Sequence, residues 1–188
     1  LFEQEGIAVP TTWEELEAAA RHFTKSANPN SPTEYGISLP YSKHQSTNFT
    51  ISPFWWALGG DYFDKDLNIS FEDDTTIEFL DWYSSMYQYS SPSSTGWVWG
   101  DLLNTFLTGQ TAMTIYLGRV LSRVYMNAPD LVGKVGTFPY PKRVLQVTED
   151  DPNYLVINAN TQYPDAAKAL VKYLVTGDVA NNFLFTVA

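Results

Sequence analysis

Apolar residues recur at helical spacing in several stretches of the chain, and the first of these stretches follows Thr12. Leu16, Ala19 and Phe23 fall on one face, and Glu15 stands three residues after Thr12, which is the arrangement of a capping box. The pattern therefore predicts a helix from Thr12 to about residue 25. The same spacing predicts further helices over residues 51–58, from Asp74 or Thr75 to 87, from about Asp101 to 109, over 120–124, over 164–177 and from about Asp178 onward.

Short runs with β character separate these helices. Strands are predicted over residues 35–39, 111–116, 134–138 and 154–157, and a β-hairpin is predicted around residues 64–68. The sequence has no internal repeat and no low-complexity tract. Because short strands alternate with helices, we expect an α/β fold with more helix than strand, in which helices cover a mixed sheet.

Composition and charge narrow the class of protein. The 188 residues are 44% hydrophobic, enough for one domain with a core. No apolar run approaches the roughly 20 residues that span a bilayer. The formal net charge of −10 argues against nucleic acid or anionic lipid as a partner. The chain has no cysteine and only two histidines, His22 and His44, so we expect neither a thiolate nor a multi-histidine metal site.

The aromatic content is high, at 15%, and includes six tryptophans and twelve tyrosines. A core of this size accommodates only part of them. Large aromatic side chains near a surface commonly mark recognition sites, since they offer rigid apolar faces with a polar tip. The sequence therefore indicates a binding surface built on aromatic side chains.

Four segments resemble the family 1 extracellular solute-binding proteins, a group that includes maltose-binding protein. They are residues 9–16 (VPTTWEEL), 55–64 (WWALGGDYFD), 106–115 (FLTGQTAMTI) and 163–174 (YPDAAKALVKYL). The first matches the family's Pro-x-Thr-Trp-Glu-Glu-Leu segment, which lies mid-chain in those proteins and begins at Pro10 here. The order and spacing of the four segments extend the resemblance over nearly the whole chain.

The resemblance implies one lobe of a periplasmic-binding-protein type II fold. Residues 1–188 would form a single lobe, the second and ligand-binding one, in a fragment that lacks the first lobe, the signal segment and the C-terminal tail. The full-length protein would be a monomer, extracellular or periplasmic and membrane-anchored. It would bind a small solute such as a sugar between its two lobes and deliver it to the ABC permease subunits. The resemblance implies no cofactor and no catalytic residue.

The resemblance also selects candidate ligand contacts near two predicted element boundaries. Trp97 and Trp99 lie in a predicted loop before a helix, where an aromatic plane can stack on a sugar ring, and Trp99 lies nearer the family's contact position. Packing of one tryptophan under the loop is the alternative. Tyr116 and Arg119 follow a predicted strand, at the family's site for an aromatic clamp. The Arg119 fork suits a hydroxyl pair or a carboxylate, so a neutral sugar, an acidic ligand and a surface salt bridge all stay open.

Further candidates precede a helix and begin a strand. Thr47, Asn48 and Phe49 come before the predicted helix of residues 51–58, and the matching stretch of the family contributes polar and aromatic ligand contacts. Ordinary N-capping by Thr47 or Asn48 is the alternative. Tyr154, at the last predicted strand, is the remaining candidate.

Other classes of function stay open as alternatives. Acidic residues with tryptophans are also typical of carbohydrate-active enzymes, which need two carboxylates roughly 5–10 Å apart. Here the acidic residues cluster at 61–74, whereas the tryptophans lie elsewhere. A protein-interaction domain is the third class. Asp64, Asp66 and Asn68 are spaced like the start of a calcium loop, but Ile69 replaces the required glycine and Thr75 the closing glutamate, which favours the hairpin.

Overall fold

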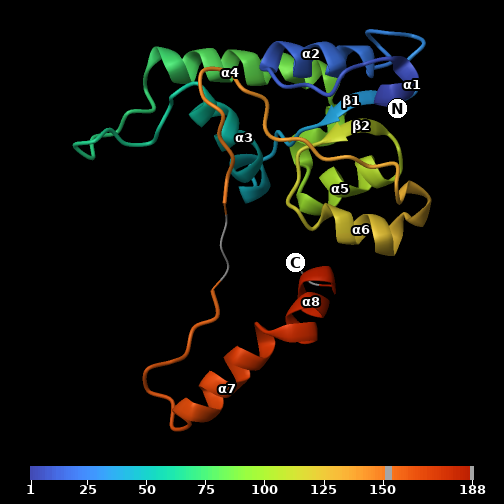
Figure 1. Ribbon diagram of the computed structural model, residues 1–188. Helices are drawn as coiled ribbons and strands as arrows, with labels where there is room; N and C mark the ends of the chain where they lie inside the picture. Colours follow the sequence, from blue (N-terminus) through green and yellow to red (C-terminus); the bar gives the residue numbers. More distant parts are fainter. Residues whose placement is uncertain (151–153, 187–188) are drawn as a thin grey trace. The chain divides into compact units, whose positions relative to one another are not determined.

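The computed structural model describes residues 1–150 and 154–186, which fall into two compact units (Figure 1). The first unit comprises residues 1–116 and 133–149. The α/β class with more helix than strand is confirmed. The elements of the first unit are α1 (Phe2–Glu5), α2 (Trp13–His22), β1 (Tyr35–Ser38), α3 (Gln45–Ala57), α4 (Asp74–Met86), two short 3₁₀ helices (Tyr87–Tyr89 and Pro92–Gly96), α5 (Trp99–Leu107) and β2 (Thr111–Thr114).

The sheet of the first unit is formed by β1 and β2, which run parallel with Ile37 opposite Met113. Helix α2 covers one face of this pair and α5 the other (Figure 1). Ile37 and Met113 are buried in one core with Leu16 of α2. Ser38 faces α5, where its hydroxyl donates to the Leu102 carbonyl at 3.2 Å. Parallel strands need a long connection, and here α3, α4 and α5 provide it.

Helix α2 begins at the capping box that the sequence predicts. The Thr12 hydroxyl accepts from the Glu15 N–H at 3.3 Å, and the Glu15 carboxylate accepts from the Thr12 N–H at 3.3 Å. The same carboxylate accepts from the hydroxyl and the N–H of Thr11, each at 2.7 Å. These hydrogen bonds, the one from the Thr11 hydroxyl first, lower the pKa of Glu15.

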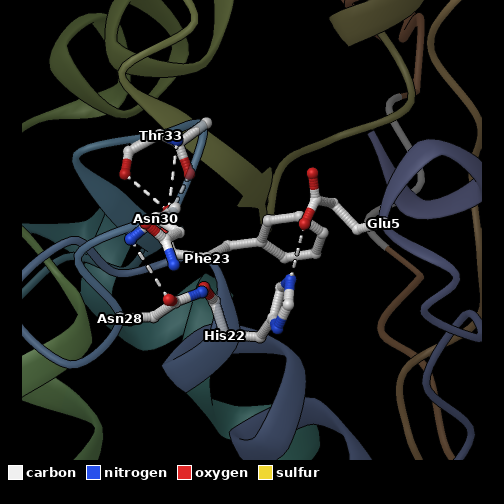
Figure 2. A network of polar contacts seen from close by, with 7 residues as sticks. Glu5, His22, Phe23, Asn28, Asn30 and Thr33 are labelled. Carbon is white, nitrogen blue, oxygen red and sulfur yellow. Dashed lines mark hydrogen bonds and ion pairs between the residues drawn. The ribbon is translucent and has the colours of Figure 1, made fainter.

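Hydrogen bonds also close the loop that follows α2 (Figure 2). Asn28 donates from its side-chain amide to the His22 carbonyl at 2.8 Å, and the Thr33 hydroxyl donates to the Phe23 carbonyl at 2.6 Å. Two carbonyl groups at the end of the helix are thereby satisfied. The His22 ring lies 3.1 Å from the Glu5 carboxylate, which ties α1 to α2 (Figure 2).

Residues 133–149 cross the first unit without a helix or strand and form a strap over its core. The Lys142 N–H donates to the Thr11 carbonyl at 2.7 Å, and the Val144 N–H donates to the Ala57 carbonyl at 2.9 Å. These bonds fix the strap to the entry of α2 and to the end of α3.

Arg143 is the charged contact of this strap. Its guanidinium forms ion pairs with Glu14 and Glu78 and lies 5.9 Å from the centroid of the Trp13 ring. Trp13 in turn stacks on Trp82 with 4.0 Å between ring centroids. The strap therefore places a cation beside the stacked Trp13 and Trp82 rings, which lie between α2 and α4.

Two helix starts differ from the sequence prediction. Helix α3 begins at Gln45, so Thr47, Asn48 and Phe49 lie inside it rather than before it. Its cap is neither Thr47 nor Asn48 but His44, whose Nδ1 accepts from the Ser46 N–H at 3.1 Å. Helix α5 begins at Trp99 rather than near Asp101.

The strands predicted over residues 134–138 and 154–157 are wrong for this structure, because neither segment pairs with a neighbouring strand in the part of the chain that is described. Residues 134–138 belong to the strap, and Phe138 packs against the core. The predicted hairpin is present only as an antiparallel bridge between Phe63 and Ile69, with Leu67 in the left-handed region at φ 63°. The sheet is therefore smaller than the sequence indicates.

The second unit comprises residues 117–132 and the segment from Asp150 onward. Its elements are α6 (Val120–Asn127), a 3₁₀ helix (Pro129–Leu131), α7 (Pro164–Leu174) and α8 (Gly177–Thr186). The helices predicted over 120–124 and 164–177 are thus present, and α7 packs against α8. Within residues 1–150 and 154–186, every helix is too short or too polar to cross a bilayer.

Candidate functional site

Three aromatic side chains from three different elements meet in the first unit. Phe49 comes from the second turn of α3, Trp99 from the first residue of α5, and Tyr116 from the segment after β2. The Phe49 and Trp99 ring centroids are 6.2 Å apart, and those of Trp99 and Tyr116 are 5.4 Å apart with the planes at 87°. All three side chains are partly exposed. We call these three residues the aromatic cluster.

Two polar candidates lie on the same helical turn as Phe49. The Thr47 hydroxyl donates to the Ser42 carbonyl at 2.7 Å, which fastens the start of α3 to the preceding loop. Asn48 is exposed, and its carbonyl accepts from the Ser52 hydroxyl at 2.7 Å. Thr47 is therefore engaged in holding the helix start, and the Asn48 amide is the more accessible of the two.

Trp97 and Trp99 are separated by their burial, although they lie two residues apart. Trp97 is only 7% exposed, its indole N–H donates to the Ser93 hydroxyl at 3.1 Å, and its carbonyl accepts from the Ser42 hydroxyl. Trp97 is therefore the tryptophan that packs under the loop, which was the alternative to a ligand contact. A pocket of about 190 Å³ lies beside it, lined by polar side chains that include Asp101 and Asn104.

Arg119 and Tyr154 belong to the second unit. Arg119 occupies the N-cap position of α6, where its side chain is partly buried and its carbonyl accepts from the Ser122 hydroxyl at 2.8 Å. Tyr154 is 79% exposed. The structure thus joins Phe49, Trp99 and Tyr116 in one cluster, while Arg119 and Tyr154 are features of the other unit.

Thr114 is a residue near the cluster that sequence reasoning did not select. It ends β2 opposite Ser38 of β1, two residues before Tyr116. Its hydroxyl is buried and has no hydrogen-bond partner among the described residues. Its place at the carboxyl end of a parallel strand, where ligands of open α/β sheets bind, is a signal that the sequence already contained.

The aromatic cluster suits binding better than chemistry. Its three side chains offer ring faces and edges and one phenol, and none of them is a carboxylate or an imidazole. The carboxylate nearest to Trp99 in sequence, that of Asp101, accepts from the Val98 N–H at 2.9 Å and so caps the start of α5. Within the described part of the chain, no group of three His, Cys, Asp or Glu side chains is arranged to hold a metal ion.

A family model described as bacterial extracellular solute-binding protein matches residues 1–180. The chain belongs to this family. This solute-binding chain is 25% identical over 179 residues to a Sinorhizobium fredii protein named "Probable amino-acid ABC transporter periplasmic-binding protein y4oP". The match covers 92% of this chain and 38% of that protein.

Solved structures of solute-binding proteins share its fold. One is an ABC transporter solute-binding protein from Thermotoga lettingae bound to α-D-tagatose, with a TM-score of 0.76 and 23% identity over 97% of this chain and 47% of that one. Another, from Agrobacterium radiobacter in complex with ribitol, has a TM-score of 0.76 and 23% identity, and the match covers 97% of this chain and 46% of that one. The expectation of a periplasmic-binding-protein type II fold is confirmed, and this chain spans about half the length of those proteins.

Proposed function

We propose that the full-length protein is the extracellular or periplasmic binding component of an ABC importer, and that it holds a sugar or polyol in a cleft between two lobes. This chain supplies most of the second lobe, and the membrane permease is the partner. The observation that carries the proposal is the aromatic cluster, since Phe49, Trp99 and Tyr116 come from separate elements and yet share one partly exposed site.

The chemistry of the cluster fits a polyhydroxylated solute. The C–H groups of a sugar or polyol pack on an aromatic plane, and its hydroxyl groups take hydrogen bonds from nearby polar side chains. Asn48 is exposed one residue before Phe49 and offers both an amide donor and a carbonyl acceptor. Apolar faces with few polar groups are the usual composition of a small-molecule site.

The cluster forms only half of a cleft in this proposal. A solute that contacts both lobes binds the closed form better than the open form and so shifts the hinge equilibrium toward closure. The protein then acts by binding and release, without breaking a bond in the solute. The structurally similar proteins bound to tagatose and ribitol support this ligand class.

A second candidate ligand is an amino acid. The name of the Sinorhizobium fredii relative favours it, and Arg119 offers a planar fork that fits a carboxylate.

A thermal-shift screen of the full-length protein against sugars, polyols and amino acids distinguishes the two ligand classes. A ligand that binds the native state raises the melting temperature in proportion to its affinity and concentration. We expect a sugar or a polyol to give the largest shift. A shift with amino acids alone would replace the proposed ligand class and retain the binding function. Formation of new products from the added sugar would instead show an enzyme.

Calorimetry with the strongest ligand then tests the cluster. We expect Trp99→Ala to weaken binding by about 30-fold or more, since truncating a central aromatic contact costs about 2 kcal/mol. Phe49→Ala and Phe63→Ala form a matched pair, because Phe63 is 52% exposed in the hairpin segment and lies outside the cluster. Phe63→Ala should leave the affinity within about twofold. Equal affinities of Phe49→Ala, Trp99→Ala and the unmodified protein would refute the assignment.

A further inference from the structure

Ser42 lies in the loop between β1 and α3, and two of its polar groups bind other segments of the first unit. Its hydroxyl donates to the Trp97 carbonyl, and its own carbonyl accepts from the Thr47 hydroxyl at 2.7 Å. Trp97 stands directly before the N-cap of α5, whereas Thr47 lies in the first turn of α3. Ser42 thus joins the beginnings of these two helices.

Each of these helix beginnings carries one ring of the aromatic cluster. Phe49 follows two residues after Thr47, and Trp99 follows two residues after Trp97. Along the chain the two rings are separated by the rest of α3, by α4 and by two 3₁₀ helices. Their centroids nevertheless lie 6.2 Å apart. The link through Ser42 therefore acts close to both rings, at a place where the sequence alone does not fix their separation.

The segments that Ser42 joins are themselves held in place. Trp97 is buried, and its indole N–H donates to the Ser93 hydroxyl at 3.1 Å. The Tyr41 N–H donates to the Ser94 carbonyl at 2.9 Å, so the loop of Ser42 is fastened to the same segment by a second hydrogen bond. On the other side, the link ends at the capped start of α3. A change at Ser42 is therefore passed on to the rings rather than absorbed by loose chain.

We propose that Ser42 is a positioning residue for solute binding, and that it sets the separation of the Phe49 and Trp99 rings. A binding site needs its contact groups within about 0.5 Å of their productive positions, and hydrogen bonds behind those groups supply this precision. The Ser42 hydroxyl is engaged with Trp97, so Ser42 acts through the rings and not by touching the solute. Its effect on affinity rests on the proposed function, whereas its effect on the rings does not.

Calorimetry with the full-length protein measures the effect on affinity, and the probe is the sugar or polyol that gives the largest thermal shift. Ser42→Ala removes the hydrogen bond to Trp97 and retains the one from Thr47, so we expect binding to weaken about fivefold. Ser42→Thr keeps a hydroxyl and should restore the affinity to within about twofold. An unchanged affinity of Ser42→Ala would overturn the proposal.

Ser31→Ala is the matched control. Ser31 is buried, and its hydroxyl also donates to a carbonyl group of a loop, that of Thr33 at 2.8 Å. It precedes β1, whereas Ser42 follows that strand, so this control removes the same kind of hydrogen bond at the other end of β1. We expect Ser31→Ala to leave the affinity within about twofold of the unmodified protein.

A double-mutant cycle separates positioning from a general loss of structure. In the Trp99→Ala background the separation of the two rings no longer matters, so Ser42→Ala should weaken binding further by less than about 1.5-fold. An equal loss of affinity in both backgrounds would show that Ser42 acts independently of Trp99, and the proposal would then be wrong.

Fluorine NMR follows the ring without a solute. In full-length protein that contains fluorotryptophan, the Trp99 resonance is the one that is lost in Trp99→Phe. We expect Ser42→Ala to shift this resonance and Ser31→Ala to leave it in place. A Trp99 resonance that does not move in Ser42→Ala would refute the positioning role. A shifted resonance in a protein that binds no sugar or polyol would support that role while refuting the proposed ligand class.

Discussion

Gly36 marks the closest approach between the sheet and α2, and replacing it by alanine gives the sharpest prediction about the fold. A Cβ added at Gly36 would lie 1.9 Å from the carbonyl oxygen of Ala20 and 2.6 Å from its Cα. Ordinary contacts of a Cβ begin at 3.4 Å, so strand and helix must separate by about 1.5 Å. Because the obstacle is backbone, no side-chain rotation can relieve the clash.

The separation would also weaken a buried hydrogen bond. The Gly36 N–H donates to the Thr24 hydroxyl at 2.9 Å, and both residues are buried. Overpacking costs about 1–3 kcal/mol, and a buried donor left without its acceptor costs about as much again. We therefore expect Gly36→Ala to lower the free energy of unfolding by about 3 kcal/mol or more, a large part of the 5–15 kcal/mol typical of a folded domain.

Urea denaturation of the full-length protein provides the measurement, with Gly100→Ala as the matched control. Gly100 lies in the first turn of α5, where an added Cβ would meet nothing within 4 Å. This substitution should be neutral or stabilise by up to about 1 kcal/mol, since alanine favours helix over glycine. A stability of Gly36→Ala within about 0.5 kcal/mol of the unmodified protein would refute the packing of β1 on α2.

Three other predictions concern single side chains of the first unit. Thr12→Ala should lower the free energy of unfolding by about 1 kcal/mol in urea denaturation, because the Glu15 N–H loses its acceptor. The pKa of Glu15 is lowered in the folded state, so its carboxylate stabilises the fold above the unfolded-state pKa, and this effect is lost as pH falls through the folded-state pKa. The difference in free energy of unfolding between the unmodified protein and Glu15→Gln should therefore disappear on acidification. A difference that does not change with pH would contradict this. Arg143→Ala should lower the free energy of unfolding by about 1 kcal/mol, and added salt should reduce this effect because it screens the two ion pairs. Lys65→Ala in the hairpin segment should leave the free energy of unfolding within about 0.5 kcal/mol of the unmodified protein.

The elements that the sequence predicted correctly are those decided by neighbouring residues. The capping box at Thr12 and Glu15 is a local arrangement, and both of its hydrogen bonds are present. The start of α3 was mispredicted because its first turns are polar and so lack the apolar spacing that indicates a helix. The cap at His44 is the feature that marks where this helix begins. The strand predicted over 134–138 failed for a different reason. A strand exists only where another strand accepts its hydrogen bonds, and no local pattern reveals whether one is present.

The candidate site was predictable in its parts but not in its grouping. The sequence selected Phe49, Trp99 and Tyr116 as separate candidates, and the fold brings these three rings together. The pattern of residues gave no reason to prefer Trp99 over Trp97 by burial, because the difference arises only in the fold, where Trp97 is buried and its indole N–H donates to Ser93. Thr114 escaped notice because threonine in a strand is common, and its buried unpaired hydroxyl, a feature that Thr111 shares, is visible only in the fold.

A crystal structure of the full-length protein with the solute that stabilises it most tests the central claim most directly. The account predicts carbon atoms of the solute within about 4 Å of the Trp99 ring, with Phe49 and Tyr116 completing the contact. Density for the solute at a site that touches none of these three side chains would contradict the account.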